Sequence, residues 1–352
     1  MKTVTVIEGM NEPRSADVAC FPVTYSLLSE EALLQEVAHA YRIDRPRTCQ
    51  LMRSGLNDSY EVTTATGSYM ARIYRAGWRS ESEIAYELEL LTHLANKGVP
   101  VSTPIPDSDG QQMRPLHAPE GARQLVLFTY APGESLRWKD EAQCYEAGKL
   151  LAAIHAGAED FVSTHSRFEL DLGCLIEKPL AEVRPYLEDL EDDWRYLEQF
   201  ATRLRARVER AIENGLDWGI CHGDFGGGNI HMAPDGSLMV FDFDICGPGW
   251  RAYDLATIKL ATTQWLELRR TASPHWEGFL QGYRSARSLA EANVIAVPLF
   301  YALRHLWGMG LQAGNVRKWG TKFMNRWYFG RRLKFFRSWE AEYEASQNGR
   351  IG

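Results

Sequence analysis

Three polar side chains in the middle of the chain have the types and the spacing that phosphoryl transfer requires. Asp224 and Asn229 lie five residues apart around three consecutive glycines, and Asp242 follows in a short apolar stretch. The reaction needs one carboxylate to orient the attacking hydroxyl, and an amide oxygen and a second carboxylate to hold a divalent cation. Mg²⁺ prefers hard oxygen ligands and keeps several waters, so two protein ligands suffice. The glycines would let backbone and substrate approach closely. We therefore predict a phosphotransferase site here.

The motif that contains these residues also resembles a known family. The segment HGDFGGGN at 222–229, followed by FDFD at 241–244, resembles the HGDxxxxN and strand-borne Asp of the aminoglycoside phosphotransferase and choline kinase family. The resemblance extends from about Cys49 to Leu260. It implies an α+β, two-lobed protein-kinase-like fold, with a small β-rich N-lobe and a larger, mostly helical C-lobe, and ATP as the phosphate donor.

The resemblance also assigns roles to individual residues. It implies that Asp224 is the catalytic base and that Asn229 and Asp242 bind magnesium. Asp244 lies two residues after Asp242, and on a strand this spacing places both side chains on the same side, so we expect Asp244 to contact a second magnesium ion or the acceptor. Asp254 follows at the predicted start of a helix, where we expect it to act as an N-cap. The resemblance implies instead that it steadies the loop and the start of this helix.

The ATP phosphates also require a cation. Kinases use a strand lysine paired with a helix Glu, but residues 3–96 contain no lysine, and Arg72 occupies the corresponding place. A guanidinium binds phosphate oxygens well, often with two hydrogen bonds. We expect Arg72 to pair with Glu87, and Met70, on the same strand face, to contact adenine. A surface ion pair is the alternative for Arg72 and Glu87.

Two further stretches would complete the nucleotide site. The predicted turn at 54–59, which ends at Ser59, would cover the phosphates, although it lacks the GxGxxG pattern of protein kinases. The stretch that contains Thr129, Tyr130 and Ala131 resembles the hinge that hydrogen-bonds adenine through backbone groups. Side-chain identity matters little at such a hinge.

The scaffold predicted around these residues has a strand-rich front and a helix-rich back. Residues 1–24 lack periodicity and suggest a loose arm. Residues 25–130 read as strands plus a helix at 81–96 and form the expected nucleotide-binding N-lobe. Residues 131–345, after a Pro-Gly break, are mostly helical and form the expected C-lobe with the catalytic loop, magnesium site and acceptor site. We expect a ligand cleft between the lobes.

Composition excludes several other classes of protein. The 352 residues are 45% hydrophobic and 24% charged, with a net charge of −7, which argues against a nucleic-acid binder. No apolar run approaches the roughly 20 residues needed to cross a bilayer, so we expect no membrane partner. Six scattered Cys without a CxxC pair favour a reducing compartment, the cytosol. Cys221, His222, His231 and Cys246 fit no usual zinc spacing.

The sequence indicates the phosphate acceptor less clearly than the phosphate donor. Only eleven residues separate Asp242 from Asp254, which is shorter than the activation segment of peptide-binding kinases and favours a small hydroxyl-bearing acceptor. Residues 301–340 carry nine Lys or Arg and one acid, and include Arg304, Arg317 and Arg326. Such a wall would suit an anionic or zwitterionic acceptor. The alternative is that these charges lie on solvated faces of core helices.

Two other functions remain open at this point. The C-terminal stretch and the segment GWRAYD at 249–254 resemble the branch with homoserine kinase-like enzymes and a bacterial stress-response Ser/Thr kinase. A stress-linked Ser/Thr protein kinase is therefore the alternative to a small-molecule kinase. A nucleotide-binding pseudokinase is a third reading, against which the intact Asp224, Asn229 and Asp242 speak.

Overall fold

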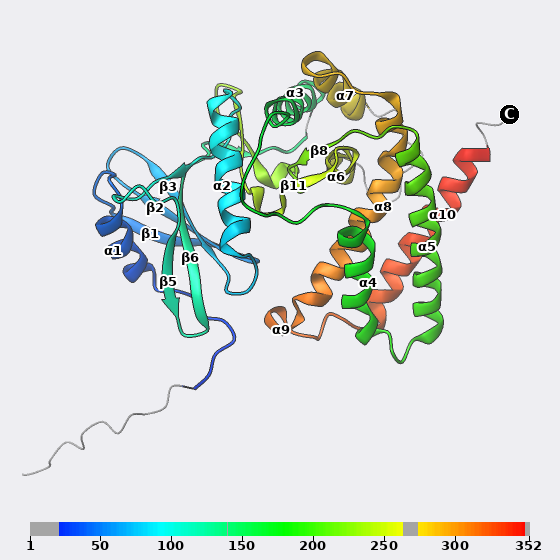
Figure 1. Ribbon diagram of the computed structural model, residues 1–352, viewed down its shortest axis with the longest axis horizontal. Helices are drawn as coiled ribbons and strands as arrows, with labels where there is room; N and C mark the ends of the chain where they lie inside the picture. The colour runs from blue at the N-terminus through cyan, green and yellow to red at the C-terminus, as the bar shows by residue number, and fades with distance from the viewer. Residues whose placement is uncertain (1–20, 139, 263–273, 349–352) are drawn as a thin grey trace, which may run out of the picture.

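The computed structural model describes residues 21–138, 140–262 and 274–348, and these form two lobes (Figure 1). The N-lobe is an antiparallel sheet in the order β1-β2-β3-β6-β4, with β5 also paired to β6. Its strands are β1 Thr48–Ser54, β2 Asp58–Thr63, β3 Ser68–Tyr74, β4 Pro104–Ile105, β5 Arg114–Ala118 and β6 Gly121–Thr129. The predicted two-lobed α+β fold is confirmed, while the predicted arm lies largely outside the described residues.

Strand alternation gives the sheet two different faces. Ala71 and Ile73 of β3 pack in a buried cluster with α1 (Glu30–Ala40). Arg72 lies between them in sequence and therefore points to the opposite face, toward α2 (Glu81–Asn96). In Figure 1, α2 lies between the sheet and the C-lobe. The strand period thus aims Arg72 at the junction of the lobes.

A single hinge segment leads from the sheet into the C-lobe. Gly133 has φ +99°, a left-handed conformation that disfavours a side chain. A Cβ there would lie 2.1 Å from the carbonyl oxygen of Met232, so the two chain segments pack backbone against backbone. The strands β7 Glu134–Ser135, β9 Ile230–Met232 and β10 Leu238–Val240 form a small sheet beside this hinge.

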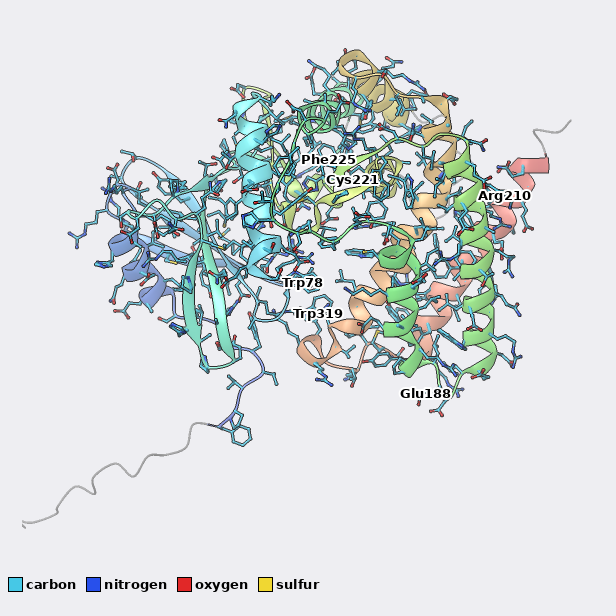
Figure 2. All side chains as sticks on the ribbon, in the orientation of Figure 1. Trp78, Glu188, Arg210, Cys221, Phe225 and Trp319 are labelled. Carbon is cyan, nitrogen blue, oxygen red and sulfur yellow. The ribbon has the colours of Figure 1, made fainter. Side chains whose placement is uncertain are left out.

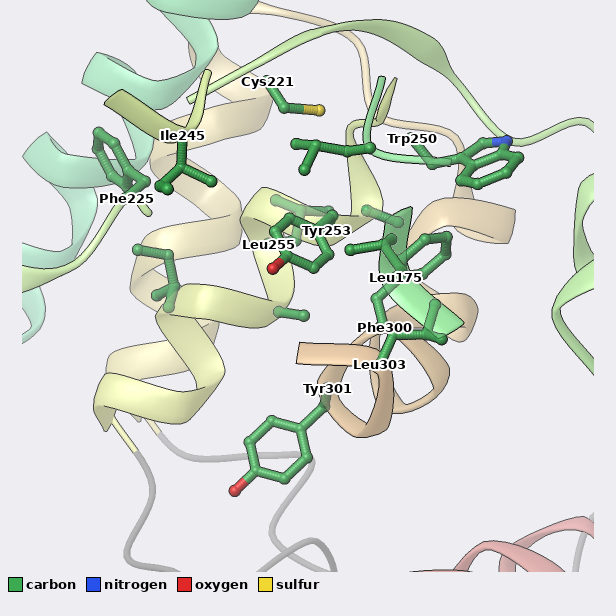
Figure 3. Packing of buried hydrophobic residues seen from close by; sticks show 14 of the residues in the cluster. Leu175, Cys221, Phe225, Ile245, Trp250, Tyr253, Leu255, Phe300, Tyr301 and Leu303 are labelled. Atoms are coloured by element: carbon green, nitrogen blue, oxygen red, sulfur yellow. The ribbon is translucent and has the colours of Figure 1, made fainter. Parts of the chain in front are cut away.

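The C-lobe is built from helices around one long apolar helix, α8. Its helices are α3 Glu141–Gly157, α4 Lys178–Val183, α5 Glu191–Glu213, α6 Ala252–Thr262, α7 Pro274–Ala286, α8 Glu291–Gly314, α9 Val316–Trp319 and α10 Arg326–Asn348. Figure 3 shows Phe300 and Leu303 of α8 in one buried cluster with Tyr253 and Leu255 of α6. A two-stranded ribbon, β8 Trp218–Cys221 with β11 Gly247–Trp250, completes this lobe.

Helix α8 is also the one described helix that is long and apolar enough to cross a membrane. However, 61% of its most apolar 18-residue stretch is buried inside the protein. Its composition is therefore that of a core helix, packed against α6 and α4.

The end of this core helix also touches the N-lobe. The guanidinium of Arg75 donates to the side chain of Asn315 over 2.6 Å, directly after α8. Lys318 of α9 donates to the carbonyl oxygen of Gly55, in the turn between β1 and β2, and lies over the ring of Tyr25. In Figure 2, Trp319 of α9 and Trp78 of the N-lobe lie close to the junction between the lobes. These contacts join the two lobes at the end of α8.

Candidate active site

The loop that carries Asp224 is anchored from below by Asp254. The carboxylate of Asp254 accepts hydrogen bonds from the backbone nitrogens of His222 and Gly223, both over 2.7 Å, and contacts the buried ring of His155 at 3.1 Å. Burial alone would raise the pKa of Asp254, but His155 and the loop amides lower it below its usual value. Asp254 therefore stays ionised and holds the loop. It does so from inside α6, which begins at Ala252, so the N-cap prediction was wrong.

Within the loop, Asn229 and Asp224 are hydrogen-bonded to each other. The amide nitrogen of Asn229 donates to Oδ2 of Asp224 over 3.0 Å and to its backbone oxygen over 2.9 Å. This arrangement leaves the amide oxygen of Asn229 free to bind a cation. The ring of His222 accepts a hydrogen bond at Nδ1 from the backbone N–H of Asp224 and donates through Nε2 to the carbonyl oxygen of Phe241, both over 3.1 Å. The geometry of the loop is thus fixed by its own side chains.

The other oxygen of Asp224 has a partner that the sequence did not reveal. Arg304 of α8 donates through Nη2 to Oδ1 of Asp224. Its Nη1 donates to the carbonyl oxygen of Gly223 over 2.9 Å and to the hydroxyl of Tyr253 over 3.0 Å. The sequence singled out Arg304 only as one of many cations in a basic stretch. No periodicity connects it with a residue so far away in the chain.

Asp242 lies just beyond strand β10 and faces Arg72 of the N-lobe. It has φ +65°, a left-handed conformation that is uncommon for Asp and marks the end of the strand. One oxygen of its carboxylate lies 3.0 Å from Nη2 of Arg72. Arg72 also donates through Nη1 to Glu87 over 3.0 Å, and Glu87 accepts from Tyr74 over 3.0 Å. Burial raises the pKa of Glu87, and the guanidinium of Arg72 counters this effect.

Asp244 follows Asp242 through a turn and not along a strand. Residues Phe243–Ile245 form a 3₁₀ turn after the left-handed Asp242, so strand alternation does not relate the two carboxylates. The predicted strand, from which we expected both side chains on one side, was therefore wrong. The buried carboxylate of Asp244 accepts from the indole of Trp78 over 2.8 Å and from Arg79 over 3.3 Å. Burial raises its pKa, but Arg79 and neighbouring cations bring the net shift below the usual value, so Asp244 ties the lobes together as an anion.

A narrow cavity opens between the sheet and the hinge, next to Arg72 and Asp242. Several residues predicted for the nucleotide site line it together: Met70, Arg72, Glu87, Thr129, Tyr130, Ala131 and Asp242. Ser59 differs, because it lies on β2 opposite Arg72 and outside this lining; the turn itself is at Gly55–Asn57. His231 was missed: its Nδ1 contacts the carbonyl oxygen of Ala131 at 2.7 Å and braces the hinge.

A second, larger cleft lies between the β3–α2 connection and the helices α4 and α8. Its walls are aromatic and charged, with Trp78, Phe168, Glu169, Asp171, Lys178, Glu182 and Trp307 among the lining residues. Trp307 stacks under the guanidinium of Arg304, with 4.6 Å between Cζ and the ring centroid. Since Arg304 contacts Asp224, one wall of this cleft is linked to the catalytic loop through Trp307 and Arg304.

The described residues contain no cluster of three or more His, Cys, Asp or Glu that could hold a metal. The amide oxygen of Asn229 and the carboxylate of Asp242 are oxygen ligands of the kind that Mg²⁺ takes, with phosphate oxygens and waters to complete the set. The residues present therefore fit an ATP-bound magnesium ion better than a permanently bound metal.

Comparison with known proteins agrees with this geometry. A model of the phosphotransferase enzyme family (APH) matches residues 48–289. An uncharacterized protein of Deinococcus radiodurans is 38% identical over 325 residues, which cover 92% of this chain and 94% of that protein. A homoserine kinase of Mesorhizobium japonicum is 28% identical over 296 residues, 79% of this chain and 87% of that enzyme.

A solved structure has the same fold. An amicoumacin kinase in complex with AMP-PNP and Ca²⁺ superimposes with a TM-score of 0.72 at 22% identity, over 90% of this chain and 94% of that one. The predicted family, inferred from the segment 222–229, is thereby confirmed. This chain belongs to the phosphotransferase enzyme family and is a kinase that transfers phosphate to hydroxyl acceptors.

Proposed function

We propose that this protein transfers the γ-phosphate of ATP to a hydroxyl group of a small molecule, with Mg²⁺ and with Asp224 as the catalytic base. The observation that carries the proposal is the arrangement around Asp224. Its carboxylate is bonded to Asn229 but keeps 40% of its side-chain surface open, and Asp242 and Arg72 face each other beside it.

Each residue has a role that follows from its contacts. Asn229 and Asp242 would hold the magnesium ion, which neutralises charge on the phosphates when it is bound. Arg72, kept in place by Glu87, would bind phosphate oxygens. The exposed edge of Asp224 would accept a hydrogen bond from the acceptor hydroxyl and then its proton.

The nucleotide base would lie in the cavity beside the hinge. This cavity is lined by apolar groups of Met70 and Phe128, and the backbone of Tyr130 and Ala131 runs along it. Apolar walls with backbone polar groups at one edge suit a flat heterocycle such as adenine.

The second cleft supports a small acceptor that carries an amino group. Glu169, Asp171 and Glu182 line it, and none of the three forms an ion pair with a residue that the structure describes. Two cations of the lining, Lys178 and Arg75, also lack such a pair, which leaves room for an anionic group as well. We therefore propose an amine-bearing or zwitterionic alcohol.

The basic stretch at 301–340 contributes less to this site than its sequence suggested. Arg304 reaches the catalytic loop, but Arg317 and Arg326 are exposed and lie outside the lining of the cleft. These two residues fit the alternative of a solvated surface. The basic stretch therefore gives little support for a purely anionic acceptor.

The experiment is a measurement of ADP release with ATP, Mg²⁺ and a matched panel of acceptors. The panel contains an amino alcohol, a hydroxy amino acid, a hydroxy acid of the same length and a generic Ser/Thr protein substrate. We expect turnover with the first two and little with the hydroxy acid. Phosphorylation of the protein substrate alone would instead establish the Ser/Thr protein kinase alternative, and binding of ATP without any turnover would indicate a pseudokinase.

We also propose that the protein resides in the cytosol. Five of its six cysteines lie in the described residues, and all five are free thiols: Cys49, Cys144, Cys174, Cys221 and Cys246. Unpaired, mostly buried thiols are typical of a reducing compartment, where ATP is also available. Detection of the protein in fractionated cells tests this location.

A further inference from the structure

Arg304 connects the catalytic carboxylate with the C-lobe core. It projects from the middle of α8, and its side chain is 14% exposed, with three hydrogen bonds to the loop and its support: Asp224, Gly223 and Tyr253. Burial lowers the pKa of Arg304, but the hydroxyl of Tyr253 and the carboxylate of Asp224 more than offset this effect, so the net shift of the pKa is upward. A charge removed from water is tolerated only with such partners, so the cation of Arg304 needs the carboxylate of Asp224 as its anionic partner.

The contact fixes the plane of the Asp224 carboxylate. The terminal torsion of an Asp side chain is soft, so one hydrogen bond leaves the carboxylate free to swing. Asn229 holds Oδ2, but this same amide must also keep its oxygen turned toward the cation. Arg304 holds Oδ1, so that the two oxygens are anchored from opposite sides. Because a carboxylate can accept about four hydrogen bonds, lone pairs remain for the acceptor hydroxyl.

Arg304 also lies directly behind a wall of the proposed acceptor cleft. Its guanidinium lies 4.6 Å above the ring of Trp307, one helical turn further along α8, and Trp307 lines the cleft. A planar guanidinium can stack on this ring and bond to the loop at the same time, whereas an ammonium group cannot do both equally well.

From these contacts we infer that Arg304 is a positioning residue that orients the base Asp224 toward the hydroxyl of an acceptor resting on Trp307. It acts on the chemical step through Asp224 and has no role in holding ATP. The inference rests on the proposed function, since it takes Asp224 to be the base.

The test compares Arg304→Met and Arg304→Lys with the exposed control Arg317→Met, all in the full chain. In Arg304→Met we expect kcat to fall on the order of 10- to 100-fold, with the KM for ATP unchanged. Arg304→Lys keeps the charge but cannot bond three groups at once, so it should recover only part of kcat. The control should behave like wild type.

A merely structural role is separated by two readouts. Adding methylguanidinium to Arg304→Ala should restore part of kcat, because it fills the place of the lost guanidinium. A variant that has only lost its fold would not be rescued in this way. Melting temperatures of all variants show whether the fold is intact. A kcat for Arg304→Met within twofold of wild type would overturn the inference, as would an equal loss of ATP binding and turnover.

The double variant Asp224→Asn/Arg304→Met keeps the two proposals apart. If Arg304 acts through Asp224, the second substitution should add little to the loss caused by the first. An active Asp224→Asn enzyme would refute the proposed base itself. An inactive Asp224→Asn enzyme combined with a fully active Arg304→Met enzyme would refute only the role of Arg304.

Discussion

Arg72 on the N-lobe sheet and Asp242 beyond β10 form an ion pair across the cleft, with 3.0 Å between Nη2 and Oδ1. Both residues are proposed ligands of the same magnesium nucleotide, one for the phosphates and one for the cation. The ion pair therefore occupies the place where phosphates and cation would lie. Binding of the nucleotide must separate the two side chains, and Glu87 would keep Arg72 in position while this happens.

We expect Asp242→Asn to abolish most of the gain in nucleotide affinity that Mg²⁺ provides. An amide is a weaker ligand for a hard cation than a carboxylate, and Arg72 would lose its partner at the same time. Calorimetric titration with ATP, with and without Mg²⁺, measures the effect. The metal assignment fails if the variant retains the full magnesium-dependent gain.

Asp224→Asn should leave ATP binding close to wild type and lower kcat by about 10²- to 10⁴-fold, as expected for loss of a general base. Asp235→Asn is the matched control, because Asp235 lies in the exposed turn between β9 and β10 and bonds only to Ser237. Steady-state rates of ADP release distinguish them. Equal activity of both variants would remove Asp224 from the mechanism.

The glycines of the catalytic loop are not equivalent. A Cβ on Gly227 would lie 2.2 Å from the carbonyl oxygen of Leu136, whereas a Cβ on Gly228 would meet nothing within 4 Å. We expect Gly227→Ala to lower stability by about 1–3 kcal/mol, as overpacking does, and to lower kcat because the loop shifts. Gly228→Ala should have little effect on stability. Thermal melting and kcat of this pair check the prediction, and similar behaviour of the two variants would contradict it.

The sequence predicted the parts of this site that depend on local signals. The limits of α2 follow from its apolar spacing, and the structure adds a capping box between Ser80 and Glu83. The catalytic loop follows from the motif at 222–229. The place of the kinase lysine on its strand indicated that Arg72 pairs with Glu87, and the structure has this ion pair.

The remaining features depend on tertiary contacts or on backbone geometry that no pattern reveals. The contact of Arg304 with Asp224 joins segments that are distant in sequence. The contact of His231 with Ala131 depends on how the hinge packs against the small sheet. The expectation for Asp244 failed because a left-handed residue ends the strand, a conformation that Asp adopts too rarely to be anticipated.

Asp244→Asn should act on stability rather than on the metal. The buried carboxylate joins Trp78 and Arg79 of the N-lobe to the C-lobe, and removal of its charge leaves Arg79 without its anionic partner. We expect a loss of about 3–5 kcal/mol, typical of a broken buried ion pair, measured by chemical denaturation. The magnesium dependence of ATP binding should remain. A variant with normal stability and a lost magnesium response would restore the metal role predicted from the sequence.

His305 should make the protein less stable in acid. Burial, together with the nearby cations Arg332 and Arg304, lowers the pKa of His305 to about 3. The unfolded chain binds this proton below about pH 6.5, whereas the folded chain does not until pH falls to about 3. Stability is therefore lost as pH falls through this window, by about 2 kcal/mol between pH 6.5 and 5. His305→Gln should show a correspondingly shallower decline between pH 7 and 5 in denaturation experiments, and an unchanged slope would contradict the prediction.

The contacts of Arg75 with Asn315 and of Lys318 with Gly55 would affect the timing of each catalytic cycle under the proposed function. They lie where the chain passes out of α8, the helix that also carries Arg304. If the turn at Gly55 covers the phosphates, ADP can leave only after these contacts break. Nucleotide exchange would then loosen the same helix that aligns the base Asp224. Asp224 would therefore be least able to activate a hydroxyl or a water molecule while the donor site is open to solvent. Such coupling would protect ATP from wasteful hydrolysis between productive encounters.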